Sequence, residues 1–365
     1  MIRILQSVNI MDRAGLETML MNYYRNINRS KIQFDFLTHR SEIGAYENEI
    51  KEMGGKIYHA PRLYPQNYNN YFKYMKNFFE EHPEYKIIHS HIDSMSYFPL
   101  LAAKKSGVPV RIGHSHNSKI DKDFKYPIKF LALKGMPNVA NAYFACSEIA
   151  GRFMWQKKDF HIIHNAIDLS KFVYNEQIRK KVFDKLNLSD DTFVVGHVGR
   201  FNKVKNQLFL LDIFNEITKI RINSLLILIG KGVDELKIRK KIHELKLDQK
   251  VIVLLDRDDV NELYHALDLF IMPSLFEGLP VVGVEAQANG LPCVFSSRIT
   301  HEIMLTNNAG MYSLGKSAKD WAINILSKDI ERNGNAFFEL KKAGYDIKSE
   351  AKKLEEWYLN KYSNI

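Results

Sequence analysis

The chain has 365 residues, of which 45% are hydrophobic and 26% are charged. These values are typical of a soluble globular protein with two domains or one large one, and they exclude wholesale disorder and a collagen-like repeat. A surplus of basic residues gives a formal net charge of +10, which favours anionic partners such as nucleotides, nucleic acid or anionic lipid without choosing among them.

The cysteine content and the apolar stretches bear on where the protein works. Cys146 and Cys293 are too few for a disulfide scaffold and indicate a reducing compartment. The first ten residues carry polar side chains where a signal peptide needs an unbroken apolar core, and the apolar stretch 267–294 is interrupted by acidic residues, prolines and glycines. We therefore expect a cytoplasmic protein, either free or attached peripherally to the inner face of the plasma membrane.

Short apolar runs without polar alternation predict two series of buried parallel strands. The first series comprises 2–8, 34–37, 56–58, 87–89, 110–113, 142–145 and 161–163, and the second comprises 194–198, 224–229, 251–254, 269–272 and 293–296. Apolar residues at helical spacing predict helices over 206–220, 234–247, 259–267 and 349–361. Asp258 or Asp259 suits the N-cap of the third of these better than a metal site.

The alternation of strands and helices predicts an α/β protein with two doubly wound parallel sheets. The two series place the domain boundary near 165–172. We expect an N-terminal domain over 1–168, a C-terminal domain over 169–345, and a final helix within 346–365 that returns to the first domain.

The stretch 273–292 follows a predicted strand and carries two carboxylates, Glu277 and Glu285. Pro280 suits the start of a helix and Gly290 its end. Glu277 then lies at the carboxyl end of a strand, where open α/β sheets bind ligands. Backbone N–H groups nearby suit a phosphate, and the carboxylates suit hydroxyl groups of a sugar or ribose. Alternatively, Glu277 interacts with the helix dipole and Glu285 is a surface residue.

Three further segments follow predicted strands. In 196–207, Arg200 and Lys205 suit a diphosphate, unless they are only basic residues of a solvated loop. In 12–18, Gly15 either lets the backbone approach a ligand or forms an ordinary strand–helix turn. In 111–118, two histidines lack a metal-ligating partner at ligand spacing, so we expect a histidine that makes hydrogen bonds in a cleft. His89 and His91 are weaker candidates for that role.

Residues 104–134 carry eight basic and two acidic side chains with aromatic residues between them. Such a segment suits an anionic membrane surface. The alternative is an ordinary amphipathic helix whose lysines extend their charged ends to water.

At these positions the chain resembles the family 4 glycosyltransferases, and within them the exopolysaccharide and capsule subgroup. Glu277 to Glu285 fits the E-x7-E signature of that family, and Gly199-Arg200 with Lys205-Asn206 fits its G-R…K-N element. The segments 111–117, 145–148, 164–168, 268–274, 285–292 and 297–303 are also similar to motifs of the family or subgroup. Two positions depart from the pattern: Ala14 replaces a glycine before Gly15, and Val204 replaces a polar residue.

The resemblance implies the GT-B architecture, in which two Rossmann-like domains face a cleft. The second domain would bind a nucleotide-sugar donor and the first an acceptor. The donor-binding residues by this resemblance are Gly15, Gly199, Arg200, Lys205, Glu277, Gly278, Leu279, Pro280 and Glu285. Arg200 and Lys205 would hold the diphosphate and stabilise the leaving group, so neither a metal nor a cofactor is expected.

The resemblance also assigns individual roles. Glu285 would bind ribose hydroxyls and Glu277 the hydroxyls of the transferred sugar. His114 would contact the sugar near the reacting carbon, with His116 as the rival for that role and Asn117 as a further candidate. The catalytic set by this resemblance is His114, Glu277, Arg200 and Lys205.

The implied function is that of a retaining, metal-independent hexosyltransferase of capsule or exopolysaccharide biosynthesis. Its donor would be a nucleotide sugar, by default a UDP-sugar, and its acceptor a lipid-linked glycan or oligosaccharide. The alternatives are a sugar-nucleotide epimerase on the same fold or a catalytically degenerate binding subunit. Nucleic acid is not an expected partner, since the sequence contains no recognisable nucleic-acid module.

Overall fold

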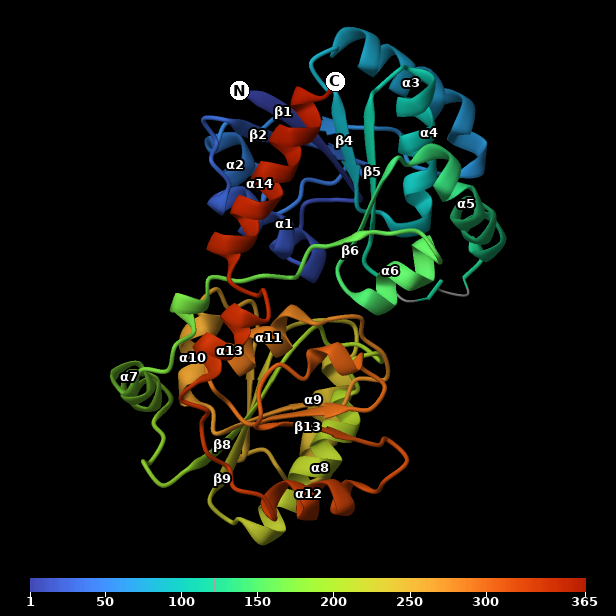
Figure 1. Ribbon diagram of the computed structural model, residues 1–365. Coiled ribbons are helices and arrows are strands. Elements are labelled where there is room, and N and C mark those ends of the chain that lie inside the picture. Colours follow the sequence, from blue (N-terminus) through green and yellow to red (C-terminus); the bar gives the residue numbers. More distant parts are fainter. Residues whose placement is uncertain (118, 121–122) are drawn as a thin grey trace. The chain divides into compact units, whose positions relative to one another are not determined.

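The computed structural model describes residues 1–117, 119–120 and 123–365 (Figure 1). Two compact units divide the chain, one formed by Met1–Ala166 with Ile347–Ile365 and the other by Ile167–Asp346. The boundaries expected at 168 and 345 lie within two residues of these limits. Ser118, Asp121 and Lys122 of the predicted histidine and basic segments lie outside the described residues.

The N-terminal unit contains a seven-stranded parallel sheet in the order β3-β2-β1-β4-β5-β6-β7. Its strands are β1 (Ile2–Val8), β2 (Ile32–Thr38), β3 (Ile57–His59), β4 (Ile87–Ser90), β5 (Val110–Ser115), β6 (Ala142–Ala145) and β7 (His161–Ile162). Its helices are α1 (Gly15–Asn26), α2 (Glu47–Glu52), α3 (Tyr68–Glu81), α4 (Tyr97–Lys105), α5 (Tyr126–Val139), α6 (Glu148–Trp155) and α14 (Ile347–Ser363).

Both faces of this sheet are buried, which explains the unbroken apolar strands. Ile4 and Leu5 of β1 point to opposite faces and belong to different hydrophobic clusters. On the Ile4 face, α14 packs beside α1 and buries Leu354 and Tyr358. The final helix therefore returns to the first unit, as predicted.

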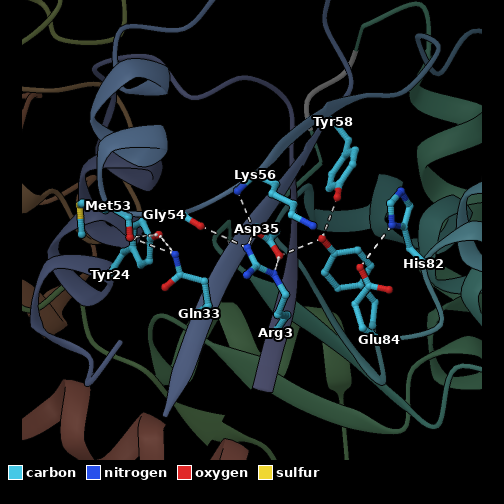
Figure 2. A network of polar contacts seen from close by, with 11 residues as sticks. Arg3, Tyr24, Gln33, Asp35, Met53, Gly54, Lys56, Tyr58, His82 and Glu84 are labelled. Carbon is cyan, nitrogen blue, oxygen red and sulfur yellow. Dashed lines mark hydrogen bonds and ion pairs between the residues drawn. The ribbon is translucent and has the colours of Figure 1, made fainter. Parts of the chain in front are cut away.

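A buried ion pair links Arg3, near the amino end of β1, to Asp35 in the middle of β2 (Figure 2). The guanidinium of Arg3 donates two hydrogen bonds to the carboxylate of Asp35, which is fully buried. Tyr85 Oη and the backbone nitrogen of Lys56 also donate to this carboxylate, over 2.8 and 2.6 Å. Because each carboxylate oxygen has two donors, the charge is compensated, and the pair is part of the fold rather than of the ligand-binding edge.

The second unit contains a six-stranded parallel sheet in the order β10-β9-β8-β11-β12-β13. Its strands are β8 (Phe193–Val198), β9 (Ser224–Ile229), β10 (Val251–Leu254), β11 (Leu269–Met272), β12 (Cys293–Ser296) and β13 (Ala309–Tyr312). Its helices are α7 (Glu176–Leu186), α8 (Gln207–Ile220), α9 (Glu235–Glu244), α10 (Val260–Ala266), α11 (Val281–Ala288), α12 (Ala318–Leu326) and α13 (Ala336–Lys342).

Two local features of this unit differ from the sequence-based expectation. The half-buried edge strand β13 was not predicted, because Ala-Gly-Met-Tyr is too weakly apolar to read as a strand. Asp259 occupies the N-cap position of α10, but its side chain makes no capping hydrogen bond. Its carboxylate instead pairs with Arg257 and Lys185, so the predicted N-cap position is confirmed but the side chain does not cap the helix.

The two sheets share one topology, in which the chain moves outward from a central strand in one direction and then in the other. The order reverses beside β1 and β4 in the first unit and beside β8 and β11 in the second. Ligands of open α/β sheets bind at the carboxyl ends of the strands where this reversal occurs. The loops after these four strands are therefore the place to look for a site in each unit.

Candidate active site

A buried histidine in β8 and a glutamine in α8 stabilise the loop that follows β8. His197 Nδ1 lies 2.9 Å from the carbonyl oxygen of Ile271, and burial lowers the pKa of His197 to about 4. The side-chain nitrogen of Gln207 donates to the carbonyl oxygen of Arg200 over 3.0 Å. These two contacts fix the loop between β8 and α8 and leave the side chain of Arg200 exposed.

Glycines let this loop pack closely against its surroundings. A β-carbon on Gly199 would lie 3.1 Å from Lys205 Cε, so the glycine makes room for the lysine stem. Gly230 and Gly232, at the end of β9, have φ angles of 146° and 159°. A β-carbon at either would lie within 2.2 Å of a backbone oxygen of the β8 loop. Sequence reasoning missed these two glycines, although a G-x-G directly after a predicted strand was the available signal.

Three interactions join the β8 loop to the loop after β11. Leu275 N donates to the carbonyl oxygen of Val204 over 2.8 Å, and Asn206 Nδ2 donates to that of Pro273 over 3.0 Å. Lys205 Nζ lies 2.8 Å from Glu277 Oε1, and both side chains are largely buried, with 15% and 18% of their surface exposed. Two predicted site residues that are far apart in sequence therefore form an ion pair.

The contact that position 204 makes with the neighbouring loop comes from its backbone and not from its side chain. The carbonyl oxygen of Val204, rather than its side chain, makes the bond to Leu275. The valine side chain is 42% exposed. The departure from the family pattern thus leaves the connection between the two loops intact.

Glu285 lies in α11 and is half-buried. Tyr264 Oη donates to its Oε2 over 2.9 Å. Burial raises the pKa of Glu285 to about 7, and the hydrogen bond from Tyr264 limits that rise. The interpretation of Glu285 as an ordinary surface residue is therefore wrong.

The loop between Glu277 and the start of α11 is short and partly buried. Leu279 is 5% exposed, and Pro280 occupies the N-cap of α11, so the helix begins one residue later than expected. A backbone bridge pairs Glu277 with Ile299, which ties this loop to the segment after β12. Gly278 lies between the carboxylate that pairs with Lys205 and the helix start.

In the N-terminal unit, the corresponding first loop is more open. Gly15 is the first residue of α1, and Ala14 is its N-cap in an extended conformation. A β-carbon on Gly15 would meet no atom within 4 Å. The free space beside Gly15 is therefore available to a ligand, but the fold of the chain itself does not require a glycine here.

Four histidines gather at the carboxyl ends of β4 and β5. His89 Nε2 lies 3.1 Å from His114 Nδ1, and His91 Nδ1 lies 3.1 Å from His116 Nε2. Burial lowers the pKa of all four rings, that of His116 to about 3. The expectation that no partner accompanies the two histidines of 111–118 is wrong, because neighbouring strands supply partners 25 residues away.

Nitrogen atoms of three of these rings lie within 4.8 Å of one another, close enough to raise the question of a metal ion. The ring nitrogens of His89 and His114 face each other at hydrogen-bond distance, and the rings of His89 and His91 are stacked with centroids 4.1 Å apart. The lone pair of an imidazole nitrogen lies in the plane of its ring, so stacked rings hold these lone pairs in separate, nearly parallel planes. The arrangement fits neutral rings that share protons better than it fits ligands of one ion.

His114 and His116 occupy different environments. His114 lies within β5 and is 1% exposed, whereas His116 follows the end of the strand and is half-buried. Asn117 is exposed, and its side chain donates to Asp93 Oδ2 over 2.6 Å. Of the two histidines, His116 is the one placed where a ligand can reach it.

The predicted basic segment does not form one helix but runs from α4 through β5 to α5. Around the start of α5, Phe124, Phe130 and Leu131 are 82%, 40% and 68% exposed. Lys125 Nζ lies 4.1 Å from the ring centroid of Tyr64, and Lys134 Nζ lies 4.5 Å from that of Phe130. This α5 surface combines exposed apolar side chains with lysines. Among the described residues, no helix is long and apolar enough to span a bilayer.

Comparison with known proteins identifies the class to which this fold and site belong. A model of "Glycosyltransferase Family 4" matches residues 13–171, and a model of "Glycosyl transferases group 1" matches residues 178–327. HepE of Anabaena, crystallised with UDP and glucose, superimposes with a TM-score of 0.80 at 18% identity, over 98% of this chain and 99% of that one. The two parallel-sheet units thus have the GT-B fold of glycosyltransferases.

Relatives in sequence place the chain more narrowly. EpsF of Bacillus subtilis, which is named as a glycosyltransferase, is 35% identical over 90% of this chain and 87% of its own length. CapH of Staphylococcus aureus, a capsular polysaccharide biosynthesis glycosyltransferase, is 26% identical over 99% of both chains. An Escherichia coli protein named UDP-Gal:α-D-GlcNAc-diphosphoundecaprenol α-1,3-galactosyltransferase is 25% identical over 77% of both chains. The chain belongs to the family 4 glycosyltransferases and is a glycosyltransferase, as the motifs predicted.

Proposed function

We propose that this chain moves a hexose-type sugar from a UDP-sugar to a lipid-linked glycan acceptor, with retention of anomeric configuration and without a metal ion, in the synthesis of a capsule or exopolysaccharide. The observation that carries this proposal is the Lys205–Glu277 ion pair at the strand ends of the second unit, with Arg200 and Glu285 on the same edge. The substrates named for the E. coli relative support the choice of donor and acceptor class.

The charges on this edge suit the two halves of a nucleotide sugar. Arg200 is exposed and Lys205 is preorganised, so together they would neutralise the diphosphate and stabilise it as it leaves. Because these cations supply the positive charge, the reaction would not need a metal. Gly199, Gly278 and the turn at Leu279 and Pro280 would bring backbone N–H groups close to the phosphates.

The two carboxylates would bind hydroxyl groups. Glu277 would accept hydrogen bonds from the transferred sugar while staying beside Lys205. Glu285 would accept from the ribose, whose hydroxyls supply hydrogen bonds that replace water around a half-buried carboxylate. Retention would follow from attack on the same face from which the diphosphate departs, with the cations of this edge steadying the departing charge.

The N-terminal unit would contribute Gly15, by close backbone approach, and one histidine. We propose His116 rather than His114 for contact with substrate, because His114 is buried within β5. Asn117 would support this position through its hydrogen bond to Asp93.

The proposed reaction is tested by release of UDP from candidate UDP-sugars in EDTA, with a lipid-linked acceptor present. Glu277→Gln should lower the rate strongly, because it removes both a hydroxyl acceptor and the partner of Lys205. Lys203→Met is the matched control, since this exposed lysine lies on the same loop outside the ion pair. Undiminished turnover in Glu277→Gln, or interconversion of free UDP-sugars without acceptor, would contradict the proposal.

The α5 surface would attach the enzyme to the membrane that holds its acceptor. Its exposed aromatic and aliphatic side chains would enter the interface while its lysines contact anionic headgroups. The doubly substituted Phe124→Ser/Leu131→Ser protein should sediment less with phosphatidylglycerol vesicles at low salt. The control protein Val233→Ser/Leu236→Ser replaces two exposed apolar residues of the other unit and should sediment with the vesicles as the wild type does. Equal sedimentation of both variants and the wild type would show that α5 is not the contact.

A further inference from the structure

The four histidines of the N-terminal unit belong to one continuous hydrogen-bonded chain. It runs from His116 through His91, Gln6, Tyr358 and His89 to His114. Its members come from β1, β4, β5, the residues just after β4 and β5, and the C-terminal helix α14. Five of the six are almost fully buried, and only His116 is half-buried.

The direction of this chain can be deduced from its middle. Tyr358 Oη lies 2.6 Å from His89 Nδ1, a short contact in which the acidic phenol is the natural donor and the imidazole the acceptor. The single phenolic proton is then used, so the oxygen is left to accept from the side-chain nitrogen of Gln6, at 3.4 Å. The amide of Gln6 therefore turns its oxygen toward His91.

The orientation of Gln6 determines the proton positions on the other side. Its Oε1 lies 2.9 Å from His91 Nε2, so that nitrogen must carry a hydrogen. A neutral imidazole carries only one, which leaves His91 Nδ1 bare to accept from His116 Nε2–H over 3.1 Å. His116 in turn is left with a bare Nδ1.

The same direction continues to the far end of the chain. His89 accepts from Tyr358 at Nδ1, so its Nε2–H donates to His114 Nδ1. The remaining hydrogen of His114 then sits on Nε2, a buried atom without a hydrogen-bond partner. This series of hydrogen bonds thus ends at one side in the buried ring of His114, and only at the other side, at His116, does it reach a position that is accessible to a ligand.

We propose that Gln6 and Tyr358 are positioning residues that fix the tautomer of His116, so that His116 offers Nδ1 as a hydrogen-bond acceptor to a hydroxyl group of the substrate. This inference rests on the proposed function for the presence of a sugar or acceptor hydroxyl at His116. It also restricts the chemical group that can bind at His116, because an unprotonated ring nitrogen accepts a hydrogen bond from a hydroxyl group and repels a phosphate oxygen. It also gives the returning C-terminal helix a role in the site, through Tyr358.

The tautomer is tested in the full-length free protein by nitrogen-15 NMR of the histidine rings. In the wild type we expect His116 protonated at Nε2 and bare at Nδ1. Tyr358→Phe removes the phenol that donates to His89 and accepts from Gln6, and Gln6→Met removes the amide that accepts from His91. Each variant should therefore give a mixture of both tautomers at His116. A wild-type His116 protonated at Nδ1, or an unchanged tautomer in both variants, would overturn the proposal.

Tyr71→Phe provides a matched control. Tyr71 is also buried and its hydroxyl also contacts a buried histidine, with Oη 3.0 Å from His39 Nε2. His39 Nδ1 faces the carbonyl oxygen of Val8, which fixes its tautomer independently. This variant should therefore lose a comparable buried bond without changing the signals of His116. Addition of Zn²⁺ serves as a second check, since a stoichiometric shift of the His89, His91 and His114 nitrogens would show an ion site and overturn the proposal.

Two isosteric variants test what His116 does with its free nitrogen. His116→Asn keeps an acceptor oxygen near the place of Nδ1, whereas His116→Gln keeps a polar group near the place of Nε2, facing His91. We expect kcat/KM to fall about tenfold more in His116→Gln than in His116→Asn. The reverse order, or wild-type turnover in both, would overturn the assignment of Nδ1 to substrate. Failure of the proposed function is distinguishable, since it would abolish UDP release in the wild type while leaving the NMR result unaffected.

Discussion

The carboxyl ends of the two sheets share one topology and differ in charge. In the second unit, this edge carries Lys205 paired with Glu277, an exposed Arg200, and Glu285. In the first unit, the equivalent edge is lined by imidazoles that burial keeps neutral at physiological pH. Sheet topology alone therefore places a site in each unit, but the side chains decide which ligand each site can take.

The difference in charge separates two kinds of ligand chemistry. An edge with two cations and preorganised loops suits a diphosphate that must be held and then released with more negative charge. An edge of neutral rings suits uncharged hydroxyl groups, because it offers donors and acceptors without strong attraction for anions. Under the proposed function, the same Rossmann-like frame would serve donor binding in one unit and acceptor binding in the other through different side chains at the strand ends.

The largest expected effect comes from breaking the charged edge. Lys205→Met should reduce kcat by about 10²–10³-fold, equivalent to about 3–4 kcal/mol, because one of two cations that face the leaving diphosphate is lost. The rate of UDP release under saturating donor measures this loss. Lys203→Met, on the same loop, should stay within about twofold of the wild type. Equal rates for the two variants would remove Lys205 from the mechanism.

A second test uses the carboxylate that is half-buried on the same edge. The folded-state pKa of Glu285 is raised from its ordinary value of 4.5 to about 7. The protonated form therefore favours folding, and its contribution is complete below about pH 4.5 and is lost as the pH rises through 7. Relative to Glu285→Gln, the wild type should lose up to about 3 kcal/mol of unfolding free energy over this window.

Denaturant unfolding of the second unit at several pH values measures this contribution. Glu244→Gln, at an exposed position of α9, is the control and should run parallel to the wild type. A constant difference between the wild type and Glu285→Gln from pH 4.5 to 7 would show that Glu285 ionises normally.

The smallest expected effects are changes in unfolding free energy that distinguish Gly15, which follows β1, from Gly199, which follows β8. Gly15→Ala should leave the unfolding free energy of the free protein within about 0.5 kcal/mol, because its β-carbon would enter open space. Gly199→Ala should cost about 1 kcal/mol or more, since the β-carbon would press on the stem of Lys205. If Gly15 approaches a ligand, Gly15→Ala should weaken turnover without destabilising the fold. A destabilised Gly15→Ala protein would show that this loop is packed as tightly as its counterpart.

Much of the fold could be predicted from the sequence, because buried parallel strands are continuous apolar runs. Twelve strands were expected where the described residues contain thirteen, and the missing one, β13, is a half-buried edge strand. The apolar residues of α14 indicated that this helix packs against the protein, and its return to the first unit was expected from the two-domain arrangement rather than from a local signal. Asp259 occupies the predicted N-cap position of α10, but its carboxylate pairs with nearby cations instead of the helix backbone.

Residues of the candidate site could be predicted where a single short segment of the sequence contains a recognisable motif. Glu277, Glu285, Arg200 and Lys205 stand in local motifs, but their pairing across two loops depends on the sheet order. The histidine network could not be predicted in this way, since its members come from separate parts of the chain. They lie on or just after β1, β4 and β5 and on α14, and Gln6 and Tyr358 are about 350 residues apart in sequence. Gln6 and Tyr358 carry no local signal at all, and only the packing of α14 against β1 brings them together.

Binding of UDP in the presence of EDTA tests most directly whether the charged edge holds a diphosphate without a metal. Isothermal titration calorimetry of the full chain compares the wild type with Lys205→Met, each with EDTA and with Mg²⁺. The proposed function predicts that the wild type binds UDP equally well in both buffers and that Lys205→Met weakens binding at least about tenfold. Binding that requires Mg²⁺, or that is unchanged in Lys205→Met, would contradict it.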